Sequence, residues 1–437
     1  MTDVVVIGGG LAGLSAAAAL GGAGFRVELL EARPFFGGRA TSYGLPNGEV
    51  IDNCQHVLLR CCVNLLDFYQ RLGVGDSVRF HRAFYFIEPG GRVTILRANR
   101  LPAPWHLAGS FLGMKCLGVR DKFAIARALR DLRRERGSRP DLDRLSMGAW
   151  LREKRQTLRA IQRFWSPVLI SAVNEDLDRI AAVHGFQVFW LAFLARSGAG
   201  EMGVPSVPLA DLYRPEALAR AGEMSIHLRR PVERIEIASG LACGVRVNGA
   251  TPQADYYVSA LPFERLEIVA PELGIGKTRF EHSPITSIHL WFDREITRLP
   301  HAALLDRNIQ WMFNKSRGRY LQLVVSASRA AAGMSRQQLV ALAHAELTGF
   351  FPASSQAKLE KAHVIKELRA TFSAAPGTEA LRPGARTGIR NLFLAGDWTS
   401  TGWPPTMEGA VRSGYRAAEA VAAAAGRPEP YLIEERA

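Results

Sequence analysis

Cysteines and long apolar runs are both scarce in this 437-residue sequence. Because no stretch of about 18 uncharged apolar residues occurs, we expect no transmembrane helix. The predicted first strand begins at Val4, so we expect no targeting segment and predict a cytoplasmic protein with reduced thiols. The number of cysteines is odd and their spacing matches no zinc motif, which predicts no metal site. These cysteines are Cys54, Cys61, Cys62, Cys116 and Cys243.

Acidic residues are also in deficit. The sequence has 55 Lys and Arg against 41 Asp and Glu, which gives a net charge of +14. Such a balance favours an anionic partner: nucleic acid, an acidic substrate or a negatively charged membrane surface. A general preference for arginine explains much of the same excess, so the charge alone does not choose among them. The length exceeds what one hydrophobic core organises, and we expect two lobes.

The first thirty residues predict a βαβ unit. Val4 to Ile7 is typical of a buried strand, Leu14 to Leu20 of a helix, and Val27 to Leu30 of a second strand. The turn between the first strand and the helix fits G-x-G-x-x-G, with Gly8, Gly10 and Gly13 at its three glycine positions. Such glycines permit a tight turn, a close approach to a pyrophosphate and close packing of helix on strand. Glu31 ends the second strand, where an acid binds ribose hydroxyls and disfavours a 2′-phosphate.

Three further segments favour FAD over NAD. Gly37-Gly38-Arg39 would place a guanidinium near the pyrophosphate. A predicted strand from Leu392 ends in Gly396-Asp397, where an acid can bind ribitol hydroxyls. Thr406 is a credible N-cap for a final helix up to about Ala425, and a helix N-terminus beside the flavin would stabilise its reduced, negatively charged form.

The central region is less regular. Residues 80–210 alternate apolar and basic stretches, and we predict that they are mostly helical. Further strands are predicted at 232–237, 256–260, 285–292 and 320–326.

On these segments the chain resembles the superfamily of flavin-containing amine oxidases and phytoene desaturases. The resemblance implies an α/β fold, with a Rossmann-like FAD-binding domain of the glutathione-reductase and amine-oxidase type. It also implies a discontiguous substrate domain of helices and a sheet. The implied FAD-binding parts are residues 1–78, 213–280 and 386–437, and the implied substrate-domain parts are 79–212 and 281–385.

Within that superfamily the chain looks most like the squalene-associated FAD-dependent hydroxysqualene dehydroxylases. The segments that carry this likeness are Ile51 to His56, Trp165 to Pro167 running to Asn174 to Asp176, Pro208 to Tyr213, and Ala395 to Ala410. Cys54 departs from the pattern, which has glycine there, and a cysteine tolerates a positive φ poorly. Arg60-Cys61-Cys62 is a second departure. Both cast more doubt on the substrate than on FAD.

The resemblance implies reductive removal of a hydroxyl from hydroxysqualene to give squalene. Protonation and loss of water would leave an allylic cation, which would accept hydride from reduced flavin. His56 is the candidate general acid because its ordinary pKa suits proton donation, although a role in binding the flavin is the stronger interpretation. The predicted substrate-lining residues are Trp403, Phe189, Trp190 and Phe193. The predicted FAD-binding residues are Gly8, Gly10, Leu11, Ala12, Gly13, Glu31, Ala32, Arg33, Gly38, Arg39, Gln55, His56, Val232, Gly396, Asp397, Met407, Glu408 and Ala410.

A hydrophobic triterpene substrate would need a route from a membrane. Leu101 to Leu117 is apolar and aromatic, with Trp105 and Phe111, and basic residues follow it. We therefore expect peripheral binding to the cytoplasmic face of the inner membrane, with an internal amphipathic helix as the bland alternative. No nucleic-acid partner is expected. The chain has no second dinucleotide motif, so an unidentified partner is expected to donate the electrons.

Three other functions fit parts of the same pattern. A carotenoid-type desaturase would run the flavin oxidatively on a similar hydrocarbon, and only the segments quoted above favour the dehydroxylase over it. A flavin amine oxidase would need a polar, amine-accepting pocket. A prenyl-lipid-binding chaperone resembling the GDP-dissociation inhibitors would bind lipid without flavin chemistry, which the intact flavin segments disfavour.

Overall fold

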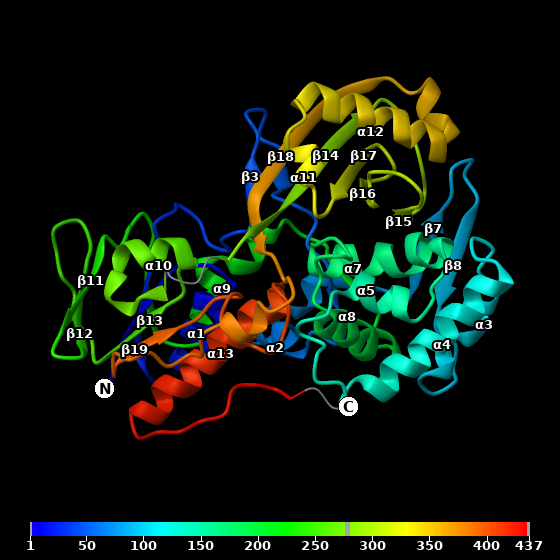
Figure 1. The fold of residues 1–437 in the computed structure, drawn as a ribbon. Helices are drawn as coiled ribbons and strands as arrows, with labels where there is room; N and C mark the ends of the chain where they lie inside the picture. Colours follow the sequence, from blue (N-terminus) through cyan, green and yellow to red (C-terminus); the bar gives the residue numbers. More distant parts are fainter. Residues whose placement is uncertain (1, 276–279, 435–437) are drawn as a thin grey trace.

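The computed structural model describes residues 2–275 and 280–434. Two sheets dominate these residues, one with five strands and one with seven. In Figure 1 the five-stranded sheet lies with α1 and α13 near the N-terminus, and the seven-stranded sheet lies above α5, α7 and α8. This mixed architecture confirms the predicted α/β fold.

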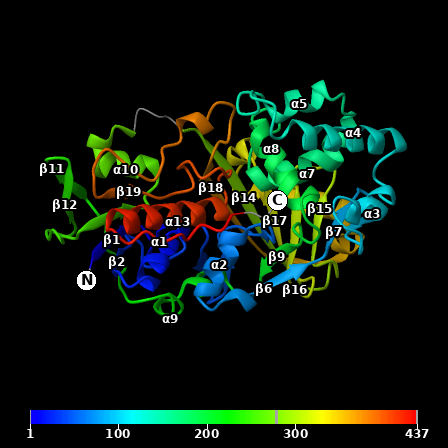
Figure 2. The same cartoon turned by 90° about the horizontal axis from the view of Figure 1, so that it is seen from below.

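The five-stranded sheet is parallel and has the strand order β10-β2-β1-β13-β19. Four of its strands, β2, β1, β13 and β19, are mostly buried, as expected for a parallel sheet covered on both faces, whereas the edge strand β10 is partly exposed. The predicted βαβ unit is confirmed. Helix α1 (Leu11–Gly22) follows β1 and packs closely on α13 (Met407–Ala424), as Figure 2 also shows. The strands are β1 (Asp3–Ile7), β2 (Arg26–Leu30), β10 (Met224–His227), β13 (Tyr256–Ser259) and β19 (Leu392–Leu394).

The seven-stranded sheet has the order β18-β14-β17-β16-β15-β7-β8, and its pairs are antiparallel except β15 with β7. Helix α12 (Arg336–Phe350) packs its buried side chains on one face, and a group of helices lies beyond the other (Figure 1). The strands are β7 (Ala83–Ile87), β8 (Val93–Arg97), β14 (His282–Phe292), β15 (His301–Leu304), β16 (Trp311–Ser316), β17 (Tyr320–Val325) and β18 (Leu359–Phe372). The five-part domain division remains a prediction about folding units.

Residues 80–210 are only partly as predicted. Helices dominate from residue 105 onward, but the stretch begins with strands. Ala83–Ile87 and Val93–Arg97 form a hairpin around Gly90 and Gly91, which both adopt positive φ. The helices are α3 (Ala108–Leu112), α4 (Val119–Glu135), α5 (Met147–Glu153), α6 (Leu158–Ala160), α7 (Ser166–Val173) and α8 (Ala182–Phe189), with π-helical turns η3 (Ile161–Trp165) and η4 (Trp190–Leu194).

Small elements complete the described chain. The predicted strand at 232–237 begins instead at Arg234, so Val232 precedes it. The remaining strands are β3 (Ser42–Gly44), β4 (Val50–Asp52), β5 (Leu58–Leu59), β6 (Val78–His81), β9 (Met202–Pro205), β11 (Arg234–Ala238) and β12 (Leu241–Arg246). The remaining helices are α2 (Val63–Arg71), α9 (Pro215–Ala219), α10 (Phe263–Val269) and α11 (Arg329–Ala332). No helix among the described residues is long and apolar enough to cross a membrane.

Candidate FAD and substrate site

The glycine turn between β1 and α1 has the shape that a pyrophosphate requires. Gly8 adopts φ +107°, and a Cβ on Gly13 would lie 1.9 Å from the Gly8 carbonyl oxygen. Gly10 is the N-cap of α1 and gives that helix no side-chain cap. The backbone N–H groups of Leu11, Ala12 and Gly13 therefore begin the helix without a capping side chain, which suits an anion. The residues present fit a dinucleotide phosphate at this end of the sheet.

Glu31 lies directly after β2, beside this turn. One carboxylate oxygen accepts the Gly9 N–H at 2.6 Å, and the other accepts the Arg33 N–H at 2.7 Å. Ala32 and Arg33 follow on the exposed surface, where Arg33 donates to the Gly38 carbonyl at 3.3 Å. Gly38 in turn approaches the turn, because a Cβ on Gly10 would lie 4.0 Å from its Cα. The acid is thus held in place, with lone pairs left for ribose hydroxyls.

Arg39 and Asp397 come from distant parts of the chain and form an ion pair of 2.8 Å. Arg39 also donates to the Ala370 carbonyl at 2.7 Å, and Asp397 is buried. Gly396 takes φ +143°, a conformation that favours glycine, and donates its N–H to Ser413 on α13. The structure therefore brings together the residues predicted for the pyrophosphate and the ribitol.

The predicted N-cap of the final helix is confirmed, since the Thr406 hydroxyl accepts the Gly409 N–H at 3.1 Å. Met407 and Ala410 belong to the first turn. The Glu408 carboxylate accepts the backbone N–H groups of Asn64 and Leu65, at 3.2 and 2.7 Å, and so caps α2. Burial raises the pKa of Glu408 to about 7. Its side chain joins α13 to α2, which leaves only its backbone for a flavin.

The loop after β4 brings Gln55 and His56 to the same region. Lys315 on β16 donates to Asp52 and to the Gln55 amide oxygen, both at 3.0 Å. Sequence reasoning missed Lys315, because its partners Asp52 and Gln55 lie about 260 residues earlier in the chain and no local pattern reports such a pair. Burial works to raise the pKa of Asp52, but Lys315 and the Leu209 N–H outweigh it and hold that pKa below its usual range.

His56 is poorly suited to donate a proton. Burial lowers the pKa of His56, so the imidazole is neutral at pH 7. Its Nδ1 lies 3.0 Å from the Cys54 carbonyl oxygen, which selects the tautomer with the proton on Nδ1. The other ring nitrogen is then an acceptor. These features favour the interpretation that His56 helps to bind the flavin.

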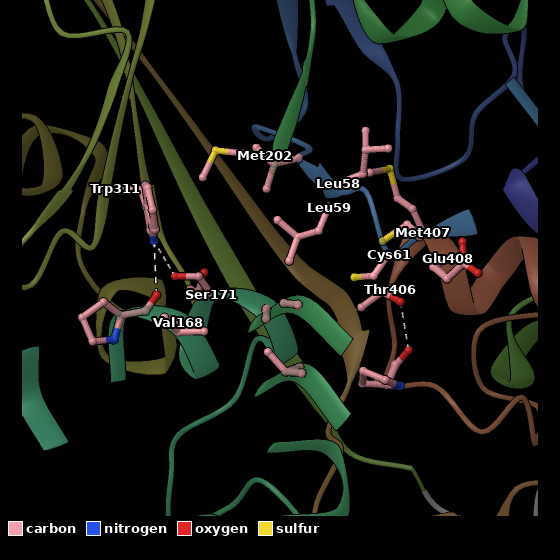
Figure 3. A pocket seen from close by; sticks show the side chains of 18 of the residues that line it. Leu58, Leu59, Cys61, Val168, Ser171, Met202, Trp311, Thr406, Met407 and Glu408 are labelled. Carbon is pink, nitrogen blue, oxygen red and sulfur yellow. Dashed lines mark hydrogen bonds between the residues drawn. The ribbon is translucent and has the colours of Figure 1, made fainter. Parts of the chain in front are cut away.

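An apolar cavity of about 230 Å³ adjoins these segments (Figure 3). At one end lie Gln55, Thr406 and Met407, and its walls come from β5, β7, β16, α7 and the α8–η4 helix. Trp311 closes one side by donating its indole N–H to the Ser171 hydroxyl at 2.6 Å. Among the described lining residues, the titratable side chains are three thiols and Glu408.

Two of the four predicted substrate-lining residues are in this lining: Trp403 and Phe193. Phe189 and Trp190, which were also predicted to line it, are not among the lining residues of this cavity. Phe189 packs its ring 4.4 Å from that of Trp165 in the core, and the Arg136 guanidinium lies 4.2 Å from the Trp190 ring centre. The reason is helical geometry, because the side of α8–η4 that faces the cavity carries Gln187, Val188, Leu191 and Ala192. Sequence reasoning also missed the strand residues Phe84, Phe86 and Phe313.

Val232 lies apart from the glycine turn in sequence, just before β11. It is buried, and its carbonyl accepts the Arg265 guanidinium at 3.0 Å. Contact of its backbone with an adenine remains a prediction.

Comparison with known proteins agrees with this geometry. Residues 11–422 match the model of the family described as flavin containing amine oxidoreductase. A zeta-carotene desaturase of Synechocystis sp. is 27% identical over 98% of this chain and 99% of its own length. A 15-cis-phytoene desaturase of Synechococcus elongatus is 26% identical over 96% of both chains.

Solved structures show the same fold. An oxidoreductase from Methanosarcina mazei matches with a TM-score of 0.71 and 19% identity, covering 94% of this chain and 98% of that one. A putrescine oxidase bound to putrescine matches with a TM-score of 0.71 and 15% identity, covering 97% of this chain and 99% of that one.

Proposed function

The chain belongs to the flavin-containing amine oxidoreductase family and uses FAD, and we propose that it transfers hydride between FAD and a long isoprenoid hydrocarbon. The observation that carries this proposal is the apolar cavity beside Gln55, Thr406 and Met407. When bound, FAD supplies two-electron hydride chemistry. The residues of the chain hold the cofactor, exclude water and align one carbon of the hydrocarbon with it.

Desaturation is the first form of this reaction. A hydride would leave one carbon and a proton its neighbour, so that a double bond forms. A two-electron acceptor such as a quinone or oxygen would be needed to complete each turnover. The curated relatives quoted above carry the names of zeta-carotene and phytoene desaturases, which supports this direction. The cavity needs no charged group to hold such a substrate.

Reductive dehydroxylation of hydroxysqualene is the second form, and the comparisons support it less than the sequence segments do. It needs a proton for the departing hydroxyl. Glu408 lines the cavity, and a carboxyl with a pKa of about 7 holds a proton in part of the molecules at neutral pH. Its oxygens, however, accept the α2 N–H groups, which counts against their reaching a substrate.

Amine oxidation receives less support from the cavity. A protonated amine buried in an apolar cavity needs an available carboxylate or other hydrogen-bond acceptors in addition to any attraction to aromatic faces. Glu408, the carboxyl in the described lining, already binds α2.

The deciding experiment supplies substrates for both reactions to the FAD-loaded protein. Phytoene and zeta-carotene are given with oxidised cofactor and a quinone, and hydroxysqualene is given anaerobically with dithionite-reduced cofactor. New conjugated double bonds, seen as absorbance, mean desaturation, and squalene means dehydroxylation. Oxygen uptake with putrescine and no action on phytoene, zeta-carotene or hydroxysqualene would contradict the proposal.

A matched pair of variants ties the activity to the cavity. Val168→Asn places an amide in the apolar wall and should lower turnover at least tenfold while the yellow flavin absorbance is kept. Ile268→Asn, at an exposed position on α10, should leave turnover unchanged.

A further inference from the structure

Exposed large apolar side chains gather on one surface. Six of the thirteen in the described residues lie between residues 101 and 158, and Trp105 is 65% exposed and Phe123 is 74% exposed. Figure 1 shows α3 and α4 at the end of the molecule opposite to the N-terminus and to β11–β12. We call these six residues the apolar face: Leu101, Trp105, Leu112, Val119, Phe123 and Leu158.

Helical spacing and contacts bring these residues together. Trp105 and Leu112 are seven residues apart along one helical segment, and Val119 and Phe123 are four apart on α4, so each pair shares a side. Lys122 donates to the Leu112 carbonyl at 2.6 Å, which joins α4 to α3. The Thr157 hydroxyl donates to Asp121 at 2.6 Å, which brings Leu158 to the start of α4.

The apolar face differs from the patch that the sequence predicted. Met114 and Leu117 are buried, and the Phe111 ring packs edge-on against Phe164 with ring centres 5.7 Å apart. These residues anchor the segment to the core. Val119, Phe123 and Leu158, which lie beyond the predicted range of 101–117, take their place on the surface. The exposed apolar side chains therefore belong to a segment that is anchored to the core by its buried residues.

Exposed cations lie close in sequence to the residues of the apolar face. Arg97, Arg100, Lys115, Arg120 and Arg127 are all exposed. Asp121 is buried and binds the Gly118 N–H and the Thr157 hydroxyl. Its charge therefore contributes little outward. Exposed apolar side chains with neighbouring cations match the acyl boundary and the anionic headgroups of a lipid bilayer.

We propose that the apolar face docks on the surface of an anionic lipid bilayer. The aromatic and aliphatic side chains enter the acyl boundary, and the neighbouring arginines and lysines contact the headgroups. Docking does not depend on the proposed reaction. If that reaction is correct, docking also sets the route of the hydrocarbon, because α3 packs on β8, whose Leu96 lines the cavity.

The test is sedimentation of the FAD-loaded protein with vesicles. Binding should be at least tenfold stronger to vesicles of phosphatidylcholine with 30% phosphatidylglycerol (about one anionic lipid in three) than to phosphatidylcholine alone, and it should weaken at 0.5 M salt because salt screens surface charges. The triple variant Trp105→Ser, Leu112→Ser, Phe123→Ser should bind at least tenfold more weakly. The matched control is Ile268→Ser, Leu368→Ser, Leu381→Ser, which removes similarly exposed apolar side chains elsewhere and should bind like the parent.

A second pair of variants tests the cations. Arg120→Gln with Arg127→Gln should reduce binding to anionic vesicles only, and Arg298→Gln with Arg214→Gln should not. Flavin absorbance in every variant reports that the fold is kept. Equal binding of the apolar triple variant and the parent would overturn the proposal. A concentration-dependent dimer that the triple variant abolishes, without vesicle binding, would also overturn it and assign the face to a second copy of the chain.

Discussion

Asp52 and Lys315 form a charged pair beside the cavity, and single substitutions there should have large effects. Asp52 is 5% exposed, and Lys315 is 3.0 Å from it. Lys315→Met leaves a buried carboxylate without its cation and should lower the free energy of unfolding by about 3–5 kcal/mol. Adding Asp52→Asn should recover most of this loss, because an amide still accepts the Leu209 N–H. Chemical denaturation measures both, with exposed Lys358→Met as the control; a small effect of Lys315→Met would refute this account.

Glu31 is the side chain on which retention of the cofactor should depend most directly. Glu31→Ala removes a ribose acceptor and also the acceptor of the Gly9 and Arg33 N–H groups. Each lost buried partner costs about 1–3 kcal/mol, so FAD affinity should fall tenfold or more. Fluorescence titration of the flavin-free protein measures it. Glu28→Ala, on the same strand, should leave the affinity within about twofold, and equal values for both variants would exclude Glu31 from the site.

At the scale of elements, the contact of α1 with α13 has no spare room. A Cβ on Gly414 would lie 2.1 Å from the Ser15 hydroxyl and 2.3 Å from the Ala12 carbonyl. Gly414→Ala must separate the two helices and should cost about 1–3 kcal/mol, with loss of flavin as α13 moves. Gly349 is exposed on α12, and a Cβ added there would have nothing within 4 Å. Gly349→Ala should therefore stabilise the folded protein by about 0.5–1 kcal/mol. Thermal unfolding compares them, and two shifts of the same sign would contradict this packing argument.

Elements also differ in how far the sequence predicts them. The glycine turn and the Thr406 cap are local, since each acts through backbone within a few residues, and they were predictable. Glu31 binds Gly9, 22 residues away, but it was predictable from its place at the end of the second strand of the βαβ unit. The partners that Glu408 and Lys315 bind lie more than 250 residues away, and no local pattern reports such pairs. Phe189 and Trp190 were predicted to line the cavity because they are aromatic, yet lining depends on which side of a π-helical turn faces the sheet. The hairpin of β7 and β8 was predictable from its alternation and from Gly90-Gly91.

At the scale of the whole molecule, buried histidines should make the fold sensitive to mild acid. Burial lowers the pKa of His184 and His289 to about 3 and that of His301 to about 4, against 6.5 in the unfolded chain. The unfolded chain therefore binds more protons than the folded protein in mild acid. The cost in stability per histidine rises below pH 6.5 toward about 1.4 kcal/mol per pH unit and ends near the folded pKa. Glu408 acts in the opposite direction, because its pKa is raised and its proton stabilises the fold below about pH 7.

The two contributions predict the sign and size of the pH dependence and can be separated by substitution. From pH 6.5 to 5.5, the three histidines should remove about 3 kcal/mol and Glu408 should return about 1 kcal/mol, so these four groups together should give a net loss of about 2 kcal/mol. His289→Gln should make the loss smaller by about 1 kcal/mol. The amide can still bond to Tyr320 and Ser287, so the native contacts are kept. Glu408→Gln should make the loss larger by a similar amount. Urea denaturation at the two pH values tests all three proteins, and parallel slopes would show that these buried groups do not govern acid sensitivity.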